Sequence, residues 1–155
     1  MKNLTKPFFL AAFLFLIFSN ATIAQETIYI TLNVDTAEVK IEGTHNYCYF
    51  NGQAATIDTR DYTVNANVGD VIVWNAVSSS SDRDQVKITA INYEGGTNVF
   101  NSDRMNGENG EVRATISKST AGKEDYKYNV SFKIVKNGKL QPGTFHIDPK
   151  IKVGS

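Results

Sequence analysis

The 155-residue sequence predicts an all-β fold: a single antiparallel β-sandwich that follows a cleaved signal peptide. Three observations predict this fold. Apolar residues alternate with polar residues over many short segments, turn-forming dipeptides separate these segments, and an apolar leader precedes them. Alternation with a period of two places one face of a strand on a core and the other face in water. A series of short strands divided by turns is typical of a sandwich.

The first 24 residues have the composition of a signal peptide. Lys2 and Lys6 supply the positive start, residues 8–18 are an unbroken apolar run, and Ala24 ends a small-residue cleavage site. The run is short for a membrane-spanning helix, and no second run follows it. We therefore expect residues 1–24 to be removed and residues 25–155 to form the β-sandwich domain, exported to the periplasm or to the outside of the cell.

The predicted strands are the segments in which apolar residues alternate. They are residues 28–34, 39–41, 62–68, 86–90, 112–116, 126–134, 145–147 and 151–153. Residues 71–77 are apolar at both parities, so we expect a central strand covered on both faces, with Trp74 in the core. Turns are predicted at Asn51-Gly52, Gly69-Asp70, Gly95-Gly96 and Asn137-Gly138. No segment after the leader has a convincing helical period.

Charge and cysteine content argue against nucleic-acid binding, attraction to an anionic membrane and an intramolecular disulfide. Lysine plus arginine and aspartate plus glutamate both number 16, so the formal net charge is zero. Loss of the leader removes two lysines and leaves the domain slightly acidic. A nucleic-acid-binding domain needs a basic surface to neutralise phosphates, so we expect no nucleic-acid partner and no attraction to an anionic membrane surface. Cys48 is the single cysteine, which excludes an intramolecular disulfide.

Two segments resemble a known family. Residues 62–75 read Tyr-x-Val-x-Ala-x-Val-Gly-Asp-x-Ile-x-Trp-Asn, and residues 126–130 read Tyr-x-Tyr-x-Val. The first resembles the Gly-Asp-joined strand pair of the cupredoxins, the plastocyanin and azurin group. The second is similar to their aromatic-x-aromatic-x-Cys strand. The resemblance covers residues 60–153 and implies a cupredoxin-like sandwich, while an immunoglobulin-like Greek key stays open as the alternative topology.

The copper ligands of that family do not carry over. Val130 stands where the family has its Cys, residues 84–86 read Asp-Gln-Val where it has a His, and residues 136–139 contain neither a second His nor a Met. The domain does hold the four side chains of a blue-copper inventory: His45, Cys48, Met105 and His146. His45 and Cys48 precede the Trp strand, and His146 is expected to face solvent. We interpret these four as scattered structural residues.

No enzyme is expected. The chain has two histidines and no serine in a nucleophile motif, so no catalytic residue is assigned. Asp82 and Asp84 are weak calcium candidates because they offer oxygen ligands in one loop, although their spacing matches no known calcium loop. No other metal site and no cofactor is predicted.

Aromatic residues beside two turns are the candidate ligand-binding residues. Tyr47, Tyr49 and Phe50 lead into Asn51-Gly52, while Tyr93 and Phe100 flank Gly95-Gly96. Aromatic rings with amide neighbours suit stacking on sugars or peptides.

The sequence therefore predicts a secreted, non-catalytic β-sandwich module that binds a protein or glycan partner or serves as a structural surface component. One alternative is a copper-binding electron-transfer protein. Another is a subunit of a larger extracellular assembly that pairs through exposed strand edges, residues 27–34 above all.

Overall fold

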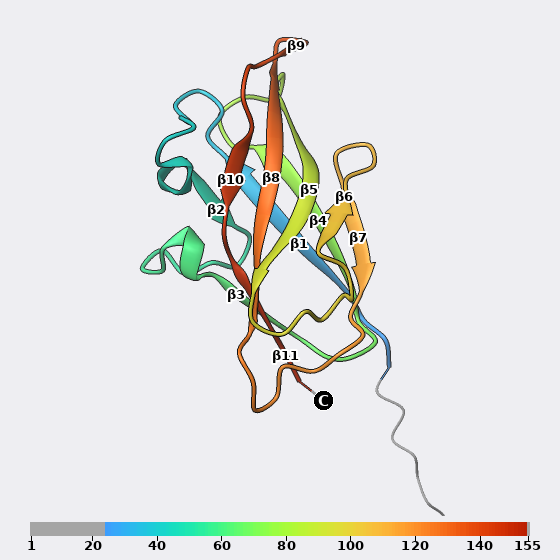
Figure 1. Ribbon diagram of the computed structural model, residues 1–155. Helices are drawn as coiled ribbons and strands as arrows, with labels where there is room; N and C mark the ends of the chain where they lie inside the picture. The colour runs from blue at the N-terminus through green and yellow to red at the C-terminus, as the bar shows by residue number, and fades with distance from the viewer. Residues whose placement is uncertain (1–23, 155) are drawn as a thin grey trace, which may run out of the picture.

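A computed structural model describes residues 24–154 of the chain. Two β-sheets enclose one hydrophobic core (Figure 1). The first, here called sheet A, has the strand order β2-β1-β4-β7. The second, sheet B, has the order β3-β11-β8-β5-β6, with β9 and β10 also paired to β8. The prediction of an all-β, sandwich-like fold is confirmed. The predicted signal peptide lies outside the described residues, apart from Ala24.

The strands are short except for β5 and β8. Sheet A contains β1 (Thr27–Val34), β2 (Cys48–Phe50), β4 (Val71–Ser78) and β7 (Val112–Thr115). Sheet B contains β3 (Thr63–Ala66), β5 (Gln85–Gly95), β6 (Arg104–Asn106), β8 (Tyr126–Lys136), β9 (Lys139–Leu140), β10 (Phe145–Ile147) and β11 (Lys150–Val153). Two 3₁₀ turns, η1 (Thr44–Tyr47) and η2 (Thr59–Asp61), flank β2. In residues 24–154, no helix is long and apolar enough to cross a membrane.

Both sheets are mixed, which corrects the prediction of an antiparallel sandwich. β1 runs parallel to β4 over its whole length, from Thr27 beside Val71 to Val34 beside Ser78. β11 runs parallel to β3. Parallel neighbours need a long connection rather than a tight turn, and residues 35–70 supply one between β1 and β4. The alternation of apolar residues is the same for both directions, so the sequence pattern could not distinguish them.

Residues 39–41 form no strand, which corrects another prediction. The main-chain carbonyl of Asp35 accepts hydrogen bonds from the amides of Glu38 and Val39, at 3.3 and 2.9 Å. The hydroxyl of Thr44 donates to the carbonyls of Lys40 and Ile41, both at 2.9 Å. These local bonds compete with strand pairing and turn the chain into η1. The strand predicted over residues 62–68 is also shorter, because β3 ends at Ala66.

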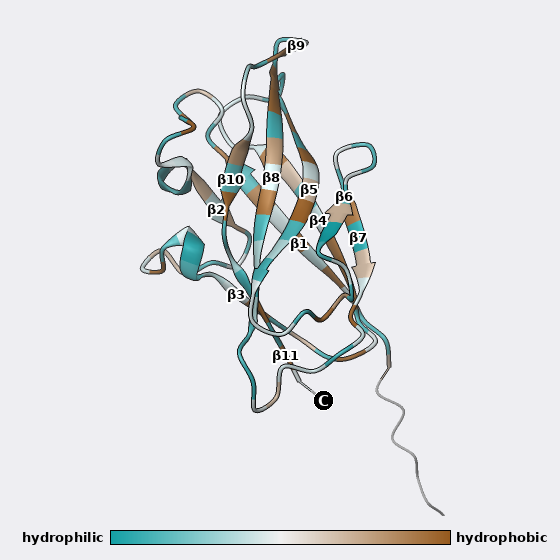
Figure 2. Ribbon diagram, in the orientation of Figure 1, coloured by the Kyte–Doolittle hydropathy of each residue, from teal (hydrophilic) through white to brown (hydrophobic). Residues whose placement is uncertain are grey.

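The central position of β4 is confirmed. It lies between β1 and β7, and its residues from Val71 to Trp74 are buried at both parities. Trp74 is fully buried and meets the rings of Phe100 and Tyr128 edge-on, with ring centroids 5.4 and 5.8 Å apart. Figure 2 shows the hydrophobic and hydrophilic residues that alternate along β5 and β8 in front of this core.

Asp70 ties the start of β1 to the turn between β3 and β4. Its side chain is 2% exposed, and its carboxylate oxygens accept hydrogen bonds from the amides of Glu26, at 3.0 Å, and Asn67, at 2.8 Å. Gly69 before it has a φ of 96°, a conformation that favours glycine. The predicted Gly-Asp turn is therefore also the anchor of the first strand.

Replacement of Asp70 by Ala is expected to lower the free energy of unfolding by about 2 kcal/mol, because two main-chain amides lose a charged acceptor. Asp70→Asn keeps one acceptor oxygen, so its free energy of unfolding is expected to lie between those of the Ala variant and the unmodified protein. Urea unfolding followed by Trp74 fluorescence measures both changes. Asp82→Ala, at an exposed position, is the control. Equal stability of the Ala variant and the unmodified protein would contradict this role.

Candidate functional site

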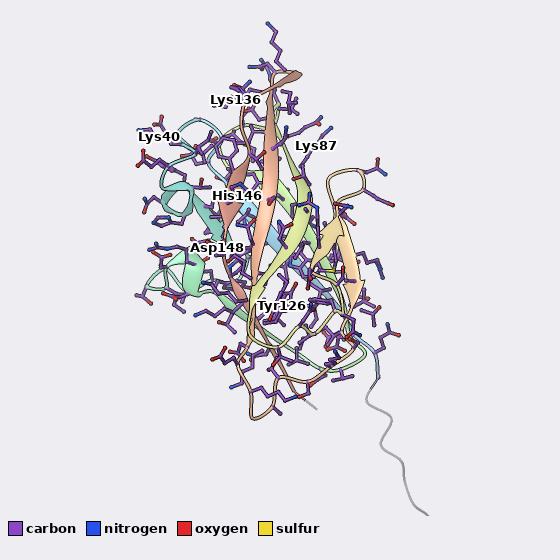
Figure 3. All side chains as sticks on the ribbon, viewed as in Figure 1. Lys40, Lys87, Tyr126, Lys136, His146 and Asp148 are labelled. Carbon is purple, nitrogen blue, oxygen red and sulfur yellow. The ribbon has the colours of Figure 1, made fainter. Side chains whose placement is uncertain are left out.

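Polar side chains cross the outer face of sheet B in one hydrogen-bonded row. We call it the polar row, and its members are Arg104, Asn92, Ser131, Asn129, His146 and Asp148. They come from β6, β5, β8 and β10 and from the residue after β10. His146 and Asp148 are labelled on this face in Figure 3. The row is the largest side-chain hydrogen-bond network on an exposed face in residues 24–154.

Strand register brings the row together. Asn92 of β5 lies opposite Asn129 of β8 on one side and opposite Arg104 of β6 on the other. Ser131 of β8 lies opposite His146 of β10. Side chains directly opposite each other on neighbouring strands are close enough to bond, so four strands contribute to one line of contacts.

A β-bulge in β5 places Asn92 on the outer face. The pairing of β5 with β8 shifts register between Ile88 and Ala90. Ile88 and Ile91 both belong to the core, so the inward parity changes between them. Uninterrupted alternation would have turned Asn92 inward. Val86, Ile88 and Ala90, the apolar residues of the predicted 86–90 pattern, are all buried, and after the bulge Ile91 takes the next core position.

The hydrogen bonds of the row all point the same way. The Arg104 guanidinium donates to Asn92 Oδ1 at 2.7 Å, and Asn92 Nδ2 donates to Ser131 Oγ at 3.0 Å. Ser131 Oγ donates to Asn129 Oδ1 at 2.8 Å, and Asn129 Nδ2 donates to Asp148 Oδ1 at 2.7 Å. Arginine can only donate and a carboxylate can only accept. Arg104 at one end and Asp148 at the other therefore fix the orientation of the side-chain amides of Asn92 and Asn129.

The row also fixes the imidazole of His146. Its Nδ1 lies 3.0 Å from Asn129 Oδ1 and 3.2 Å from Ser131 Oγ. Because an amide oxygen only accepts, Nδ1 carries a proton, and whenever the ring is neutral Nε2 is left as an acceptor. Asn129 and Ser131 are buried, at 9% and 6% exposure, whereas His146 is exposed. The row thus presents a rigid buried base with exposed groups above it.

Charged residues border the row at the side of Asp148. The pKa of Glu94 is raised by partial burial first and by the negative charge of Asp148 second, while Lys127 and His146 oppose the shift. Arg60 belongs to the same shallow hollow as Lys127 and Asp148. Acidic and basic groups therefore stand side by side at this end.

Ser131 and His146 do not have the arrangement of a serine nucleophile with its base. A nucleophilic serine must be free to attack and must have a base that takes its proton. The Ser131 hydroxyl is buried, it already donates to Asn129, and Nδ1 of His146 carries a proton rather than accepting one. The exposed edges offer the Arg104 donors, the His146 acceptor and the Asp148 carboxylate.

The structure does not bring the five predicted aromatic residues into one patch. Phe50 is 1% exposed and stacks on Tyr62 in sheet A, with ring centroids 4.7 Å apart, which corrects its surface assignment. Phe100 packs edge-on against Trp74, and Tyr93 stacks on the ring of Tyr126. The pattern of apolar neighbours around two turns could not show that these rings complete the core.

Tyr49 and Tyr47 keep accessible rings. Tyr49 is 49% exposed on β2, and Tyr47 is half-buried at the end of η1. A ligand-binding role for these two residues stays a prediction.

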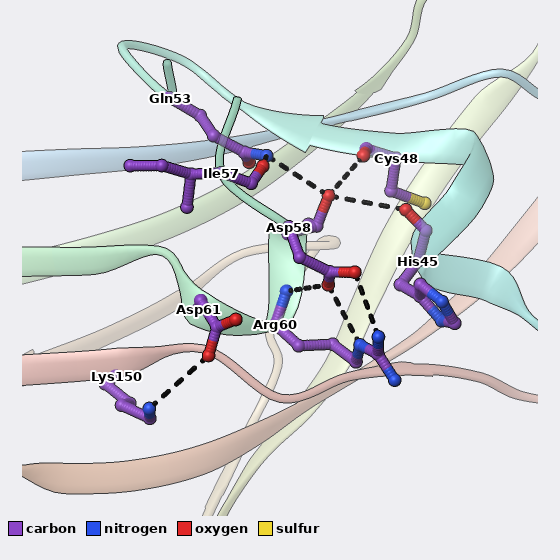
Figure 4. A network of polar contacts seen from close by, with 9 residues as sticks. His45, Cys48, Gln53, Ile57, Asp58, Arg60, Asp61 and Lys150 are labelled. Carbon is purple, nitrogen blue, oxygen red and sulfur yellow. Dashed lines mark hydrogen bonds and ion pairs between the residues drawn. The ribbon is translucent and has the colours of Figure 1, made fainter. Parts of the chain in front are cut away.

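The copper inventory is dispersed over the fold. Cys48 is buried at the start of β2, Met105 lies on β6 opposite Ile91, and His146 is on the outer face of sheet B. His45 lies in η1, where its carbonyl accepts from the Thr59 hydroxyl (Figure 4). Among residues 24–154, no three His, Cys, Asp or Glu side chains are grouped so that they could hold a metal ion.

The calcium candidates have other contacts. Asp84 accepts a hydrogen bond from the Thr36 hydroxyl at 2.8 Å and from the Asn137 amide at 3.3 Å, which anchors two loops. Asp82 is exposed. The sequence analysis missed Asn92, Asn129, Ser131, Asp148 and Arg104, because single polar residues on strands carry no signal of the neighbours that register gives them.

Comparison with solved structures supports the fold. The crystal structure of the inclusion body protein PixA from Burkholderia cenocepacia J2315 matches with a TM-score of 0.61 and 12% sequence identity, over 87% of this chain and 99% of that chain. At this identity the match shows the fold alone. The all-β, two-sheet architecture is compatible with the cupredoxin resemblance.

A second structure gives a weaker match. The McoA multicopper oxidase from the hyperthermophile Aquifex aeolicus matches with a TM-score of 0.29 and 11% identity, over 84% of this chain and 30% of that chain. That TM-score supports no argument about this protein. Neither the family models nor the curated proteins contain a match to the chain.

The Cys48 thiol is expected to be unreactive in the folded protein. Burial first, and the negative charge of Asp35 second, raise its pKa from 9.0 to about 12. Iodoacetamide at about pH 8 should therefore alkylate it only after unfolding, because the thiolate is the reactive form. Rapid alkylation of the native protein would contradict this burial.

The same shift predicts a pH dependence of stability. Above pH 9 the unfolded thiol loses its proton while the folded thiol keeps it, so the folded state binds more protons and stability falls as pH rises. Between about pH 8 and about pH 11 the loss of stability due to Cys48 is expected to be about 2 to 3 kcal/mol. Urea unfolding of Cys48→Ala should show a correspondingly smaller pH dependence than the unmodified protein.

Proposed function

We propose that this chain is an exported, non-catalytic β-sandwich module that binds a glycan along the polar row. The observation that carries the proposal is the unidirectional chain of hydrogen bonds from Arg104 to Asp148 on the outer face of sheet B. The leader predicted at residues 1–24 supports export, and the lack of an enzyme motif in the sequence supports the non-catalytic role.

The chemistry of the row favours a hydroxyl-rich ligand. Sugar hydroxyls both donate and accept, and the row presents donors at Arg104 and acceptors at His146 Nε2 and Asp148. Asn129 and Ser131 hold these groups in place from below, so little side-chain entropy is lost when a ligand binds. The row lies across an open sheet face, which suits an extended chain molecule better than a small enclosed ligand.

A second candidate is a structural module that assembles with copies of itself. The fold likeness to an inclusion body protein supports it, and so does an open strand edge. β2 pairs with β1 at Leu32–Val34 only. Val71 donates its amide to the Glu26 carbonyl on the β4 side, whereas Asn51 donates to the Thr31 carbonyl on the opposite side.

Alternation along β1 therefore aims the main-chain groups of Thr27 and Tyr29 away from β4. Within residues 24–154, no strand pairs with this part of β1 on that side. Tyr29 is 65% exposed. No proline or basic residue protects the edge, as natural sheet edges usually require.

Glycan binding is tested by an array of neutral and acidic oligosaccharides, followed by NMR titration of the isotope-labelled protein. We expect the shifted amides to lie on β5, β8 and β10, and Asn92→Ala and His146→Ala to weaken binding at least about fivefold. Tyr49→Ala tests the aromatic residues predicted from the sequence. Absence of any glycan ligand, or loss of binding in Tyr49→Ala alone, would contradict the polar row as the site.

Assembly is tested by light scattering over a wide range of protein concentration. Thr27→Pro removes an amide that faces the open edge and keeps the bonds to β4, so it is expected to reduce any self-association by about tenfold. Thr27→Ala keeps the amide and serves as the matched control. A protein that stays monomeric at every concentration contradicts the second candidate.

A further inference from the structure

Lysines directly oppose one another along β8. The cross-strand pairs are Lys87 with Lys133, Lys136 with Lys139, and Lys127 with Lys150. Like charges at directly opposite positions destabilise a sheet. Three such pairs on one strand are therefore not explained by the stability of the fold.

The pair of Lys127 and Lys150 has acidic neighbours. Lys150 Nζ lies 3.6 Å from Asp61 Oδ1. The positive charge of Lys127 acts on Glu94, so the two side chains are near each other. This pair adjoins the Asp148 end of the polar row and is locally balanced.

The other four lysines have no such partner. We call Lys87 and Lys133, the opposed pair on the same side of sheet B as the polar row, the lysine group. Among residues 24–154, the ion pairs within 4.0 Å are those of Arg60 with Asp58 and of Lys150 with Asp61, and neither involves the group. Asp84, on a neighbouring loop, is engaged with Thr36 and with the Asn137 amide. The lysine group thus places two positive charges side by side without an ion pair within 4.0 Å, although Asp82 and Asp84 line one hollow with Lys87.

The lysine group continues the polar row. Odd-numbered residues of β8 face outward because the even-numbered ones from Tyr126 to Ile134 belong to the core. Ser131 and Lys133 are consecutive outward positions, about 7 Å apart along the strand. Figure 3 shows Lys87 on the part of sheet B above His146. A ligand lying along β8 meets hydroxyl-binding groups first and cationic groups next.

We infer that the ligand of the polar row is an acidic polysaccharide, whose sugar hydroxyls bind the row and whose carboxylate or sulfate groups bind the lysine group. This inference rests on the glycan-binding function proposed above. A nucleic acid would also present anions, but the amides, imidazole and carboxylate of the row suit sugar hydroxyls. Lysine is a compact charge that binds such anions without demanding one geometry.

The test compares an oligomer of uronic acid with a neutral oligosaccharide of the same length, by calorimetry on the purified protein. The acidic oligomer is expected to bind at least about tenfold more tightly, and its affinity is expected to fall as salt concentration rises. Lys87→Gln with Lys133→Gln should remove this preference and leave the neutral ligand unaffected. Lys118→Gln with Lys123→Gln, at exposed loop positions that precede β8 and lie outside the lysine group, is the matched control.

Stability provides an independent readout. Removal of one opposed pair relieves repulsion, so the Lys87→Gln, Lys133→Gln protein is expected to unfold at a higher urea concentration while it binds the acidic ligand less well. If the variant lost binding because it misfolded, the urea concentration at the midpoint of unfolding would fall instead.

The outcomes separate this inference from the proposed function. If neutral and acidic oligomers bind equally, the glycan site stands and the acidic specificity is wrong. If the control double variant loses as much affinity as the β8 variant, the lysine group is not the determinant. If double-stranded DNA binds more tightly than the uronic acid oligomer, the polysaccharide assignment is overturned. If no glycan binds, both proposals fail.

Discussion

The hydrogen bond from Trp74 Nε1 to the Tyr128 hydroxyl, 3.1 Å long, joins the two sheets inside their core. Both side chains are fully buried, so this polar contact is shielded from water and is costly to leave unmade. Burial raises the pKa of Tyr128 far above its ordinary range and outweighs the opposing effect of the hydrogen bond from Trp74, so the hydroxyl stays neutral. Because Trp74 is on β4 and Tyr128 on β8, the contact sets which faces of the two central strands point inward.

Because the inward face of each sheet packs in the core, the outer face of sheet B can carry polar and charged side chains. On β8 the inward residues are large and apolar, and the outward ones are lysine, asparagine and serine. The bulge near Ala90 then turns Asn92 of β5 to the same side. The polar row is thus built on the two longest strands, which are paired with each other and rigidly attached to the core. A binding surface on such elements holds its groups more exactly than a loop would.

The electrostatics of this face differ from those of the chain as a whole. A net charge of zero excludes a strong long-range field, yet charge is unevenly distributed along β8. Near Asp148, acidic and basic groups alternate, whereas the two lysines of the lysine group lie directly opposite each other and form no ion pair within 4.0 Å. The zero net charge that argued against a basic surface describes the average composition, and strand pairing determines the local charge that a ligand meets.

The sequence alone was sufficient to predict two apolar-faced sheets, a central strand at residues 71–77 and the Gly69-Asp70 turn, because alternation and turn residues are local signals. It could not predict parallel pairing, the exclusion of residues 39–41, or the burial of Phe50, since these depend on long-range neighbours and on local side-chain bonds. The polar row was equally hidden. Asn92, Asn129 and His146 are far apart in the chain, and only register and one bulge bring them together. Tertiary structure decided the site because the hydrogen-bond partners of an outward polar residue come from the neighbouring strand, and no local sequence pattern specifies which strand that is.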